Sequence, residues 1–395
     1  MKIVVVHNTY QQHGGEDEVV AAESAILERN GHKVVRYSRN NDEISSLSRS
    51  QQLLLVRDFI HSEKSKRELY ALLQTEKPDV VHIHNTFIMI SPSVYEACRD
   101  AAIPVVQTLH NYRLICPGWS LSRDGRVCEE CIDDGLWHSV WHSCYRDSRL
   151  MTAAVALMLQ VHRTKGTWKR SVHSYVALTN FAREKFIQGG LPSSAIHVKP
   201  NFLESDPGER SASGRTFLFV GRLSTEKGVH TLLDAWQELS RSVPLMIIGD
   251  GPLRRSLETA VRVKGLSNIT FTGWLSKPDV YAAVKNATAL IIPSVCYEGF
   301  PMTLVEAFAC GTPVIGSNLG SVQEIVIDGR NGLHFAAGDA DDLAGKVEWA
   351  WARPAVLKAM GRACRQDFVQ LYSAETNYKR LLQIYEETVS QASAN

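Results

Sequence analysis

The strongest constraint on the fold of this chain is a set of short apolar runs, rich in Val and Ile, that alternate with longer segments of helical spacing. The runs do not alternate apolar with polar residues, which is typical of parallel strands covered by helices on both faces. They form two series, residues 3–6, 33–37, 80–84, 105–108 and 174–178, then 216–221, 245–249, 269–272, 290–293, 313–316 and 332–335. Two series predict an α/β protein with two doubly wound parallel-sheet domains.

The boundary between the two domains is expected in the polar segment 204–214, which contains Pro, Gly and Ser and is followed directly by a new apolar run. A length of 395 residues agrees with two domains. We expect a first domain over residues 1–204 and a second over residues 205–372. Residues 373–395 have helical spacing and are expected to pack back on the first domain.

The composition indicates which binding partners are unsuited to this chain and in which cellular compartment it is expected. The chain has 43 Lys and Arg against 42 Asp and Glu, and this balance argues against a nucleic-acid binder that works by bulk charge. The N-terminus has too short an apolar run for a signal peptide, and no apolar segment approaches the ~20 residues of a transmembrane helix. We therefore expect a cytoplasmic protein whose eight cysteines are reduced thiols or metal ligands.

Two predicted strand-to-helix turns carry residue types that bind phosphate. Gly14 and Gly15 follow the first strand, where glycine lets the backbone approach a ligand beside a helix N-terminus; an ordinary tight turn is the alternative. Arg222 and Lys227 bracket the equivalent turn of the second domain. Arg offers a forked contact and Lys a point charge, which suits a diphosphate. Two solvated surface cations are the alternative for this pair.

A third turn carries two carboxylates eight positions apart. Glu298 precedes Gly-Phe-Pro in a predicted loop, and Glu306 lies on the helix that follows. Because a change from loop to helix separates them, we expect them to serve different parts of one ligand. Carboxylates accept paired hydrogen bonds from the vicinal hydroxyls of ribose and hexose rings. Acidic residues also favour helix N-termini, but this explains Glu298 poorly because it lies ahead of the helix.

Together these motifs resemble retaining glycosyltransferase family 4. The resemblance rests on Arg222 with Lys227, on the Glu-Gly-Phe-Pro…Glu pattern of residues 298–306, and on the Ala-Cys-Gly-Thr-Pro-Val-Ile that follows. It extends over most of the chain and is strongest over residues 216–335. It implies the GT-B fold, in which two Rossmann-like domains face each other across a cleft. The nucleotide-sugar donor would lie in the C-terminal domain and the acceptor would face the N-terminal one.

The resemblance also implies a role for each matching residue. Arg222 and Lys227 would hold the donor diphosphate and neutralise it as it leaves. Glu306 would bind the ribose hydroxyls and Glu298 the transferred sugar. The other implied positions are Gly299, Phe300 and Pro301 beside the sugar and phosphates, Gly273 and Leu275 beside the base, Gly14 and Gly15 near the phosphate and the acceptor, and His110 as the active-site histidine. The expected catalytic residues are His110, Glu298, Arg222 and Lys227.

The implied reaction moves a sugar, with retention of configuration, from a UDP- or GDP-type donor to a glycan, lipid-linked or small-molecule acceptor in polysaccharide or glycoconjugate biosynthesis. A front-face mechanism fits, because no carboxylate has to act as a covalent nucleophile and the leaving phosphate can help deprotonate the acceptor. No cofactor is expected for catalysis. The one Asp-x-Asp string, residues 339–341, is interpreted as a helix cap.

An apolar segment, residues 151–161, leads into a basic one, residues 162–170. Because relatives often act on lipid-linked acceptors, this patch could rest on an anionic membrane, which would make the protein peripheral at its inner face. An ordinary helix with a solvated end is the interpretation that we favour.

Four of the cysteines cluster in an insertion that departs from the family core: Cys116, Cys128, Cys131 and Cys144. Thiolates at short spacing can hold a tetrahedral structural zinc, and some family members carry similar cysteines here. Reduced cysteines used for packing are the next alternative, and an iron–sulfur cluster is the least favoured.

Other functions fit the sequence less well. A nucleotide-sugar epimerase of GT-B fold is an alternative, but Arg222 and Lys227 with the two carboxylates favour transfer. A non-catalytic sugar-nucleotide-binding subunit is another, and the presence of every expected donor-site residue argues against it. A dehydrogenase is disfavoured, because no Gly-x-Gly-x-x-Gly turn with a later acidic ribose ligand is present.

Overall fold

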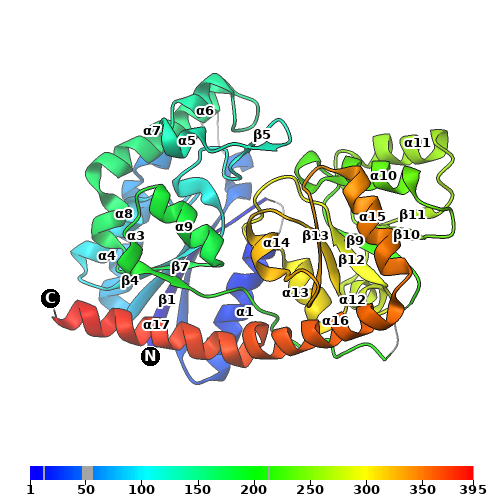
Figure 1. Ribbon diagram of the computed structural model, residues 1–395. Coiled ribbons are helices and arrows are strands. Elements are labelled where there is room, and N and C mark those ends of the chain that lie inside the picture. The colour runs from blue at the N-terminus through cyan, green and yellow to red at the C-terminus, as the bar shows by residue number, and fades with distance from the viewer. Residues whose placement is uncertain (12–13, 47–56, 212–213, 395) are drawn as a thin grey trace. The chain divides into compact units, whose positions relative to one another are not determined.

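The computed structural model describes residues 1–11, 14–46, 57–211 and 214–394. The chain divides into two compact units: unit 1 comprises Met1–Trp119, Glu129–Glu204 and Ala374–Asn395, and unit 2 comprises Ser120–Cys128 and Ser205–Ser373. Each unit contains one parallel six-stranded sheet with helices packed on it (Figure 1). The predicted α/β class with two doubly wound sheets is therefore confirmed.

The segment 120–128 differs from the expectation, because it belongs to unit 2 and not to the first domain. Its two short strands, β5 (Ser122–Arg123) and β6 (Arg126–Val127), pair with each other as an antiparallel hairpin. They add nothing to the sheet of unit 1. No apolar run marks the hairpin, so no local pattern separates it from its neighbours.

The sheet of unit 1 has the strand order β2-β1-β3-β4-β7-β8. Its strands are β1 (Lys2–Thr9), β2 (Lys33–Asn40), β3 (Val80–Asn85), β4 (Val105–Leu109), β7 (Ser174–Ala177) and β8 (Ile196–Val198). The first five coincide with predicted runs. The edge strand β8 was missed, because the three residues Ile-His-Val do not form an apolar run.

Helices of unit 1 follow the strands and cover the sheet. They are α1 (Gly15–Arg29), α3 (Glu63–Glu76), α4 (Ser93–Asp100), α5 (Glu130–Asp133), α6 (His138–Trp141), α7 (Arg149–Lys165), α8 (Thr167–Ser171), α9 (Asn180–Gln188) and α17 (Ala374–Ala394), with single helical turns at Asn41–Ser46, Tyr112–Leu114 and Ser193–Ala195. The last helix, α17, packs on this unit although it comes from the end of the chain (Figure 1). Its Leu381, Ile384 and Tyr385 share one apolar cluster with Ile3 of β1 and Val106 of β4.

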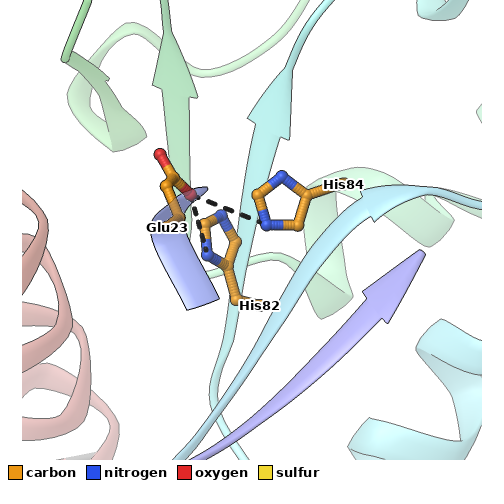
Figure 2. Close-up of side chains that lie close together, drawn as sticks. All are labelled: Glu23, His82 and His84. Atoms are coloured by element: carbon orange, nitrogen blue, oxygen red, sulfur yellow. Dashed lines mark ion pairs between the residues drawn. The ribbon is translucent and has the colours of Figure 1, made fainter. Parts of the chain in front are cut away.

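Unit 1 also buries charged and polar side chains beneath α1. Glu23 of α1 is 2% exposed, and His82 and His84 of β3 are 0% and 5% exposed. The two histidines are two positions apart on one strand, so they project from the same face of the sheet. In Figure 2 both imidazole rings lie beside the Glu23 carboxylate. The apolar run 80–84 therefore contains a polar site within the core.

The sheet of unit 2 has the strand order β11-β10-β9-β12-β13-β14. Its strands are β9 (Phe217–Val220), β10 (Leu245–Ile248), β11 (Ile269–Gly273), β12 (Ala289–Ile292), β13 (Val314–Ser317) and β14 (Gly332–Phe335). Every one of them was predicted as an apolar run. The helices are α10 (Val229–Glu238), α11 (Arg254–Val263), α12 (Lys277–Lys285), α13 (Met302–Ala309), α14 (Gly320–Ile325), α15 (Ala340–Trp351) and α16 (Pro354–Asp367), with a single turn at Thr225–Lys227 and a π-helical turn at Phe368–Tyr372.

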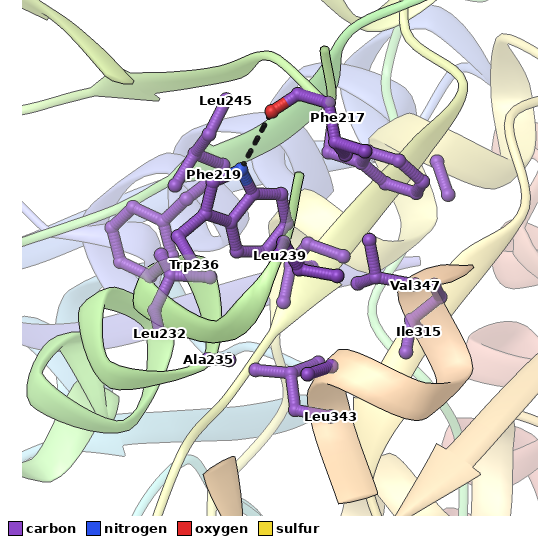
Figure 3. Packing of buried hydrophobic residues seen from close by; sticks show 14 of the residues in the cluster. Phe217, Phe219, Leu232, Ala235, Trp236, Leu239, Leu245, Ile315, Leu343 and Val347 are labelled. Atoms are coloured by element: carbon purple, nitrogen blue, oxygen red, sulfur yellow. Dashed lines mark hydrogen bonds between the residues drawn. The ribbon is translucent and has the colours of Figure 1, made fainter. Parts of the chain in front are cut away.

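Trp236 of α10 lies in the core of unit 2 (Figure 3). Its side chain is fully buried, and its indole nitrogen donates to the Val243 carbonyl at 3.1 Å. Its ring centroid is 5.7 Å from that of Phe217 on β9, edge to face. Leu343 and Val347 of α15 belong to the same cluster. These contacts fix α10, and with it the turn that precedes α10, to the sheet.

The Asp-x-Asp string behaves as the sequence predicts. Asp339 is the N-cap of α15, and its carboxylate accepts a hydrogen bond from the Asp342 backbone N–H at 2.9 Å. This is the usual stabilisation of a helix start. None of the described helices is long and apolar enough to cross a membrane.

Candidate active site

The switch point of the unit 2 sheet lies between β9 and β12, because the strands that follow β9 are added first on one side of it and then on the other. Ligands of doubly wound sheets bind outside the carboxyl ends of the strands at such a point. The loop after β9 carries Lys227, and the loop after β12 carries Glu298. The strand order thus brings together two predicted site residues that are 71 positions apart.

Lys227 and Glu298 form a close ion pair. The Lys227 ammonium lies 2.7 Å and 2.8 Å from the two Glu298 carboxylate oxygens, and the Ser294 hydroxyl donates to the Glu298 Oε1 at 2.6 Å. The Glu298 side chain is 12% exposed and that of Lys227 is 30% exposed. Burial raises the pKa of Glu298, but Lys227 and Ser294 outweigh it, and the net pKa lies below the ordinary value. Burial lowers the pKa of Lys227 and Glu298 reverses this, so both groups are charged at neutral pH.

Gly228 allows the two loops to meet. Its φ is +67°, and a Cβ atom at this position would lie 1.7 Å from the Pro293 carbonyl oxygen. Only glycine combines this backbone conformation with such a close approach. Beside it, the Val295 N–H donates to the Glu226 carbonyl at 3.0 Å. The backbone therefore places Lys227 against the loop that carries Glu298.

Glu306 is separate from this pair. It lies on α13, is 8% exposed, and its carboxylate is 3.5 Å from the Lys277 ammonium. The two carboxylates therefore have different cationic neighbours, Lys227 for Glu298 and Lys277 for Glu306. Glu306 comes from the helix and Glu298 from the loop ahead of it, as the sequence indicated.

The other donor-site positions predicted in unit 2 lie at the end of β11 and in the loops that follow β9, β11 and β12. Arg222 is exposed in the loop after β9, and Leu275 is half-buried in the loop after β11. Gly273 ends β11 at a φ of +75°, and a Cβ atom there would be 2.8 Å from the Arg254 guanidinium. The stretch Gly299-Phe300-Pro301 leads into α13, and the Gly299 carbonyl accepts a hydrogen bond from Ser321 at 3.3 Å.

Three predicted residues lie in unit 1, also after strands of its sheet. His110 directly follows β4, and Gly14 and Gly15 begin α1 after β1. The Gly14 N–H donates to the Asp17 carboxylate at 3.0 Å, and the other Asp17 oxygen is 2.7 Å from the His7 Nε2. This geometry fixes the start of α1 against β1.

The first turn of α1 is acidic, with Glu16, Asp17 and Glu18. Burial and the neighbouring Asp17 raise the pKa of Glu16 to about 8, so Glu16 is protonated at neutral pH. The remaining carboxylates offset the partial positive charge of the helix N-terminus. The attraction of this turn for phosphate is therefore weaker than the glycine pair alone suggests.

Glu23, His82, His84 and Lys199 form a buried polar group that no sequence motif predicts. The Glu23 Oε2 lies 3.9 Å from the His82 Nδ1 and 3.7 Å from the His84 Nε2 (Figure 2). Among the residues that the structure describes, Glu23, His82 and His84 form one group in which the possible metal-ligand atoms lie within 4.8 Å of one another. The signal that could have found them is the His-x-His pattern inside an otherwise apolar run.

This group fits a hydrogen-bonded network better than a metal site. The Lys199 ammonium lies 2.6 Å from the Glu23 Oε1, and a positive charge there repels a metal cation. Both ring nitrogens of His82 are also engaged, one with the Tyr385 hydroxyl at 2.7 Å and the other with the Thr108 hydroxyl at 2.8 Å.

The cysteines of the insertion are divided between the units. Cys116, Cys131 and Cys144 belong to unit 1, and Cys128 belongs to unit 2. A hydrogen bond with Cys116, together with burial and the nearby Cys144, raises the pKa of Cys131 well above its ordinary value. Three of the four thiols thus share one neighbourhood.

Two doubly wound domains, with charged residues after the strands at the switch point of one, define the class of GT-B transferases. Residues 204–367 match the family model "Glycosyl transferases group 1", and residues 13–206 match the model "Glycosyltransferase Family 4". The chain therefore belongs to the glycosyltransferases that these two models describe, and its fold is GT-B.

Known proteins agree with this assignment. A glycogen synthase of Mycobacterium tuberculosis (strain H37Rv) is 29% identical over 319 residues, which are 78% of this chain and 69% of the relative. The D-rhamnosyltransferase WbpZ of Pseudomonas aeruginosa is 33% identical over 40% of this chain and 42% of its own length. The structure of Anabaena Alr3699/HepE in complex with UDP superimposes with a TM-score of 0.69 at 17% identity, over 98% of this chain and all of that one. The same Anabaena protein has been solved with UDP-glucose, with a TM-score of 0.68 at 18% identity over 99% of this chain and all of that one.

Proposed function

We propose that this glycosyltransferase moves a sugar, with retention of configuration, from a nucleoside-diphosphate sugar of the UDP or GDP type to a glycan, lipid-linked or small-molecule acceptor. The observation that carries the proposal is the Lys227–Glu298 ion pair at the switch point of the unit 2 sheet. The UDP and UDP-glucose complexes of the Anabaena protein support a nucleotide-sugar donor. The proposed setting is polysaccharide or glycoconjugate biosynthesis in the cytoplasm.

In the proposed mechanism, Lys227 and Arg222 stabilise the diphosphate as it leaves. The Lys227 ammonium has three N–H donors, and contacts with the two Glu298 oxygens leave one for a phosphate oxygen. Arg222 is exposed in the same loop and would add a forked contact. Negative charge develops on the phosphate as its bond to the sugar breaks, and cations placed there in advance lower the barrier.

The carboxylates would grip the two sugar rings of the donor. Glu298 would accept hydrogen bonds from hydroxyls of the transferred sugar while Ser294 holds its carboxylate in orientation. Glu306 would bind the ribose, with Gly273 and Leu275 beside the base and residues 299–301 beside the phosphates. His110, Gly14 and Gly15 would serve the sugar and the acceptor from unit 1. The leaving phosphate would take the acceptor proton, so the step needs no covalent sugar–enzyme bond.

A panel of nucleotide sugars tests this function. We expect the purified chain to hydrolyse or transfer from at least one UDP or GDP sugar, and NMR of the fresh product should show the anomeric configuration of the donor. Inversion would contradict the retaining mechanism. Conversion of the donor to its epimer would indicate an epimerase, and binding without any turnover would indicate a non-catalytic subunit.

We propose that the thiols Cys116, Cys131 and Cys144 of unit 1 ligate a structural zinc; Cys128, the fourth ligand that the sequence predicts, belongs to unit 2. The neighbourhood of the first three supports this, since soft thiolates at short spacing suit a tetrahedral zinc site. Elemental analysis of the purified chain should give about one zinc per molecule, lost in Cys131→Ser and kept in Cys98→Ser, whose cysteine is buried outside the insertion. Zinc far below one per molecule would reject the site.

We also propose a peripheral membrane contact, but through a different surface from the basic segment that the sequence suggests. In the basic segment 162–170, His162 is 0% and Trp168 is 5% exposed, so these two side chains belong to the core and not to a surface patch. The exposed apolar side chains lie before it: Trp141 is 72% and Leu150 is 82% exposed, and Arg149 between them is exposed as well. Aromatic and basic side chains together suit an anionic membrane surface.

Sedimentation with liposomes tests this contact. The protein should co-sediment with vesicles that contain anionic lipid and not with neutral ones, and Trp141→Ser should weaken the binding about threefold or more, by the loss of one buried aromatic ring. Trp274→Ser is the matched control, because Trp274 is 79% exposed but lies in unit 2. Equal recovery with both kinds of vesicle would contradict an anionic membrane surface.

A further inference from the structure

The candidate active-site histidine, His110, is held by a second histidine. The His110 Nε2 lies 3.0 Å from the His84 Nδ1, and the planes of the two rings are inclined by 24°. His110 directly follows β4, and His84 lies on the neighbouring strand β3. Because His84 is 5% exposed, this contact is shielded from water. A neutral imidazole has one N–H and one lone pair, so the hydrogen bond requires one ring to donate and the other to accept.

The far side of the His84 ring faces a buried carboxylate. The His84 Nε2 is 3.7 Å from the Glu23 Oε2, and among the described residues this oxygen has no hydrogen-bond partner. The other oxygen, Oε1, accepts from the Lys199 ammonium at 2.6 Å, and Lys199 is fully buried. The two groups form a buried ion pair. The charge that faces His84 is therefore negative.

The neighbouring His82 does not compete for this role. Its Nδ1 is hydrogen-bonded to the Tyr385 hydroxyl and its Nε2 to the Thr108 hydroxyl. Asn377 of α17 lies 3.2 Å from Lys199 and donates to the Pro200 carbonyl. The helix α17 thus supplies Tyr385 and Asn377 to the frame that holds the Lys199–Glu23 pair beside His84.

These contacts select one arrangement of protons. A carboxylate oxygen opposite the His84 Nε2 favours an N–H on that atom, because a lone pair there would be repelled. The His84 Nδ1 then carries the lone pair and accepts, so the His110 Nε2 carries the proton and donates. Burial lowers the pKa of both His84 and His110 well below the ordinary value, which leaves each ring with a single proton.

We infer that His84 is a positioning residue: with the Glu23–Lys199 pair behind it, it fixes His110 in the Nε2–H tautomer and leaves the His110 Nδ1 as a hydrogen-bond acceptor for a hydroxyl of the bound ligand. This role for His110 rests on the proposed sugar transfer. The tautomer itself is a property of unit 1 and does not depend on the transfer. A neutral acceptor nitrogen orients a hydroxyl of the ligand without adding a charge.

Nitrogen-15 NMR of the full chain, labelled at histidine, reads the tautomer directly. The His110 signal is assigned by its loss in His110→Gln. In the wild-type protein we expect His110 to be protonated on Nε2 and not on Nδ1. Protonation on Nδ1 in the wild-type protein would overturn the inference without any further variant.

Two substitutions separate the hydrogen bond from the space that His84 fills. His84→Asn keeps an acceptor oxygen near the position of Nδ1, and His84→Leu removes it. We expect His84→Leu to mix the His110 tautomers and to lower kcat/KM about tenfold, near the value of one lost hydrogen bond, whereas His84→Asn keeps the tautomer and most of the rate. His162→Leu, which removes a fully buried histidine elsewhere in unit 1, should leave the His110 tautomer unchanged.

The readouts keep the two proposals apart. An unchanged His110 tautomer in folded His84→Leu would overturn the positioning role even if the enzyme transfers sugar normally. The expected tautomer in a chain that consumes no nucleotide sugar would leave the positioning role intact and reject the proposed function.

Discussion

Replacement of Lys227 by alanine is expected to lower kcat for the donor sugar by about 10²–10³-fold, the range found when one preorganised donor to a developing charge is removed. The leaving diphosphate would lose the positive charge of the Lys227 ammonium, which lies at the switch point of the unit 2 sheet. The Glu298 carboxylate would also lose the ammonium that lies 2.7 Å away. Steady-state kinetics with the best donor of the nucleotide-sugar panel measures the loss.

The pH dependence gives this prediction a second readout. In the wild-type protein the pKa of Glu298 lies below its ordinary value because Lys227 and Ser294 outweigh burial. The stability that the ion pair contributes is therefore present above the ordinary carboxyl pKa and is lost as the pH falls through the lowered one. In Lys227→Ala burial acts with less opposition, so the pKa of Glu298 rises and the acidic limb of the rate profile should move to higher pH.

The control for Lys227→Ala is Lys264→Ala. Lys264 also pairs with a carboxylate, that of Asp234 at 3.1 Å, but both side chains are exposed and lie away from the switch point. This control should change kcat less than twofold, because exposed ion pairs contribute little. Equal rates for Lys227→Ala and the wild-type protein would reject the assignment of Lys227 to the diphosphate.

Replacement of Lys199 by methionine is expected to lower the free energy of unfolding of unit 1 by about 3–5 kcal/mol, since it leaves one member of a buried ion pair without its partner. The Lys199 side chain is 0% exposed and the Glu23 side chain is 2% exposed. The Glu23 carboxylate would then face two histidines of lowered pKa without a counter-ion. Chemical denaturation monitored by fluorescence measures the loss.

A second variant distinguishes the charge from the packing at this position. In Lys199→Met with Glu23→Gln no ionised partner is left behind, so we expect the double variant to recover at least half of the lost stability. Lys379→Met is the matched control, because its ion pair with Glu375 is exposed on both sides and should contribute less than about 0.5 kcal/mol. Equal losses for Lys199→Met and Lys379→Met would contradict the importance of the buried pair.

Much of the fold could be predicted because its signals are local. A strand of a parallel sheet is covered on both faces, so its own residues are apolar and the run is visible without any knowledge of its partners. This holds for β1 and for β9, which have buried side chains on both faces. It fails for β8, which has three residues, and for the β5–β6 hairpin, whose strands have two residues each. Neither contains a run long enough to be recognised.

The sequence predicts which residue types lie in the candidate site, but it does not predict which of these residues contact each other. The chemistry of their turns predicts that Lys227 contacts a diphosphate and Glu298 a sugar, and both roles stay predictions. The structure shows in addition that they are ion-paired with each other, which depends on β9 and β12 being neighbours. The buried group of Glu23, His84 and Lys199 was not recognised, because its members come from a helix, a strand and a loop far apart in the sequence.

The sequence by itself determined the class of the protein: alternating apolar runs and helical segments specify two doubly wound sheets, and the turns after the strands contain the residue types that bind phosphates and sugars. Only the tertiary structure decided which of these residues touch. The order of strands in a sheet, and the return of α17 to unit 1, follow from how whole elements bury their apolar faces. No local pattern encodes that choice, so the pairs Lys227–Glu298, Lys199–Glu23 and His84–His110 become visible only once the sheets are assembled.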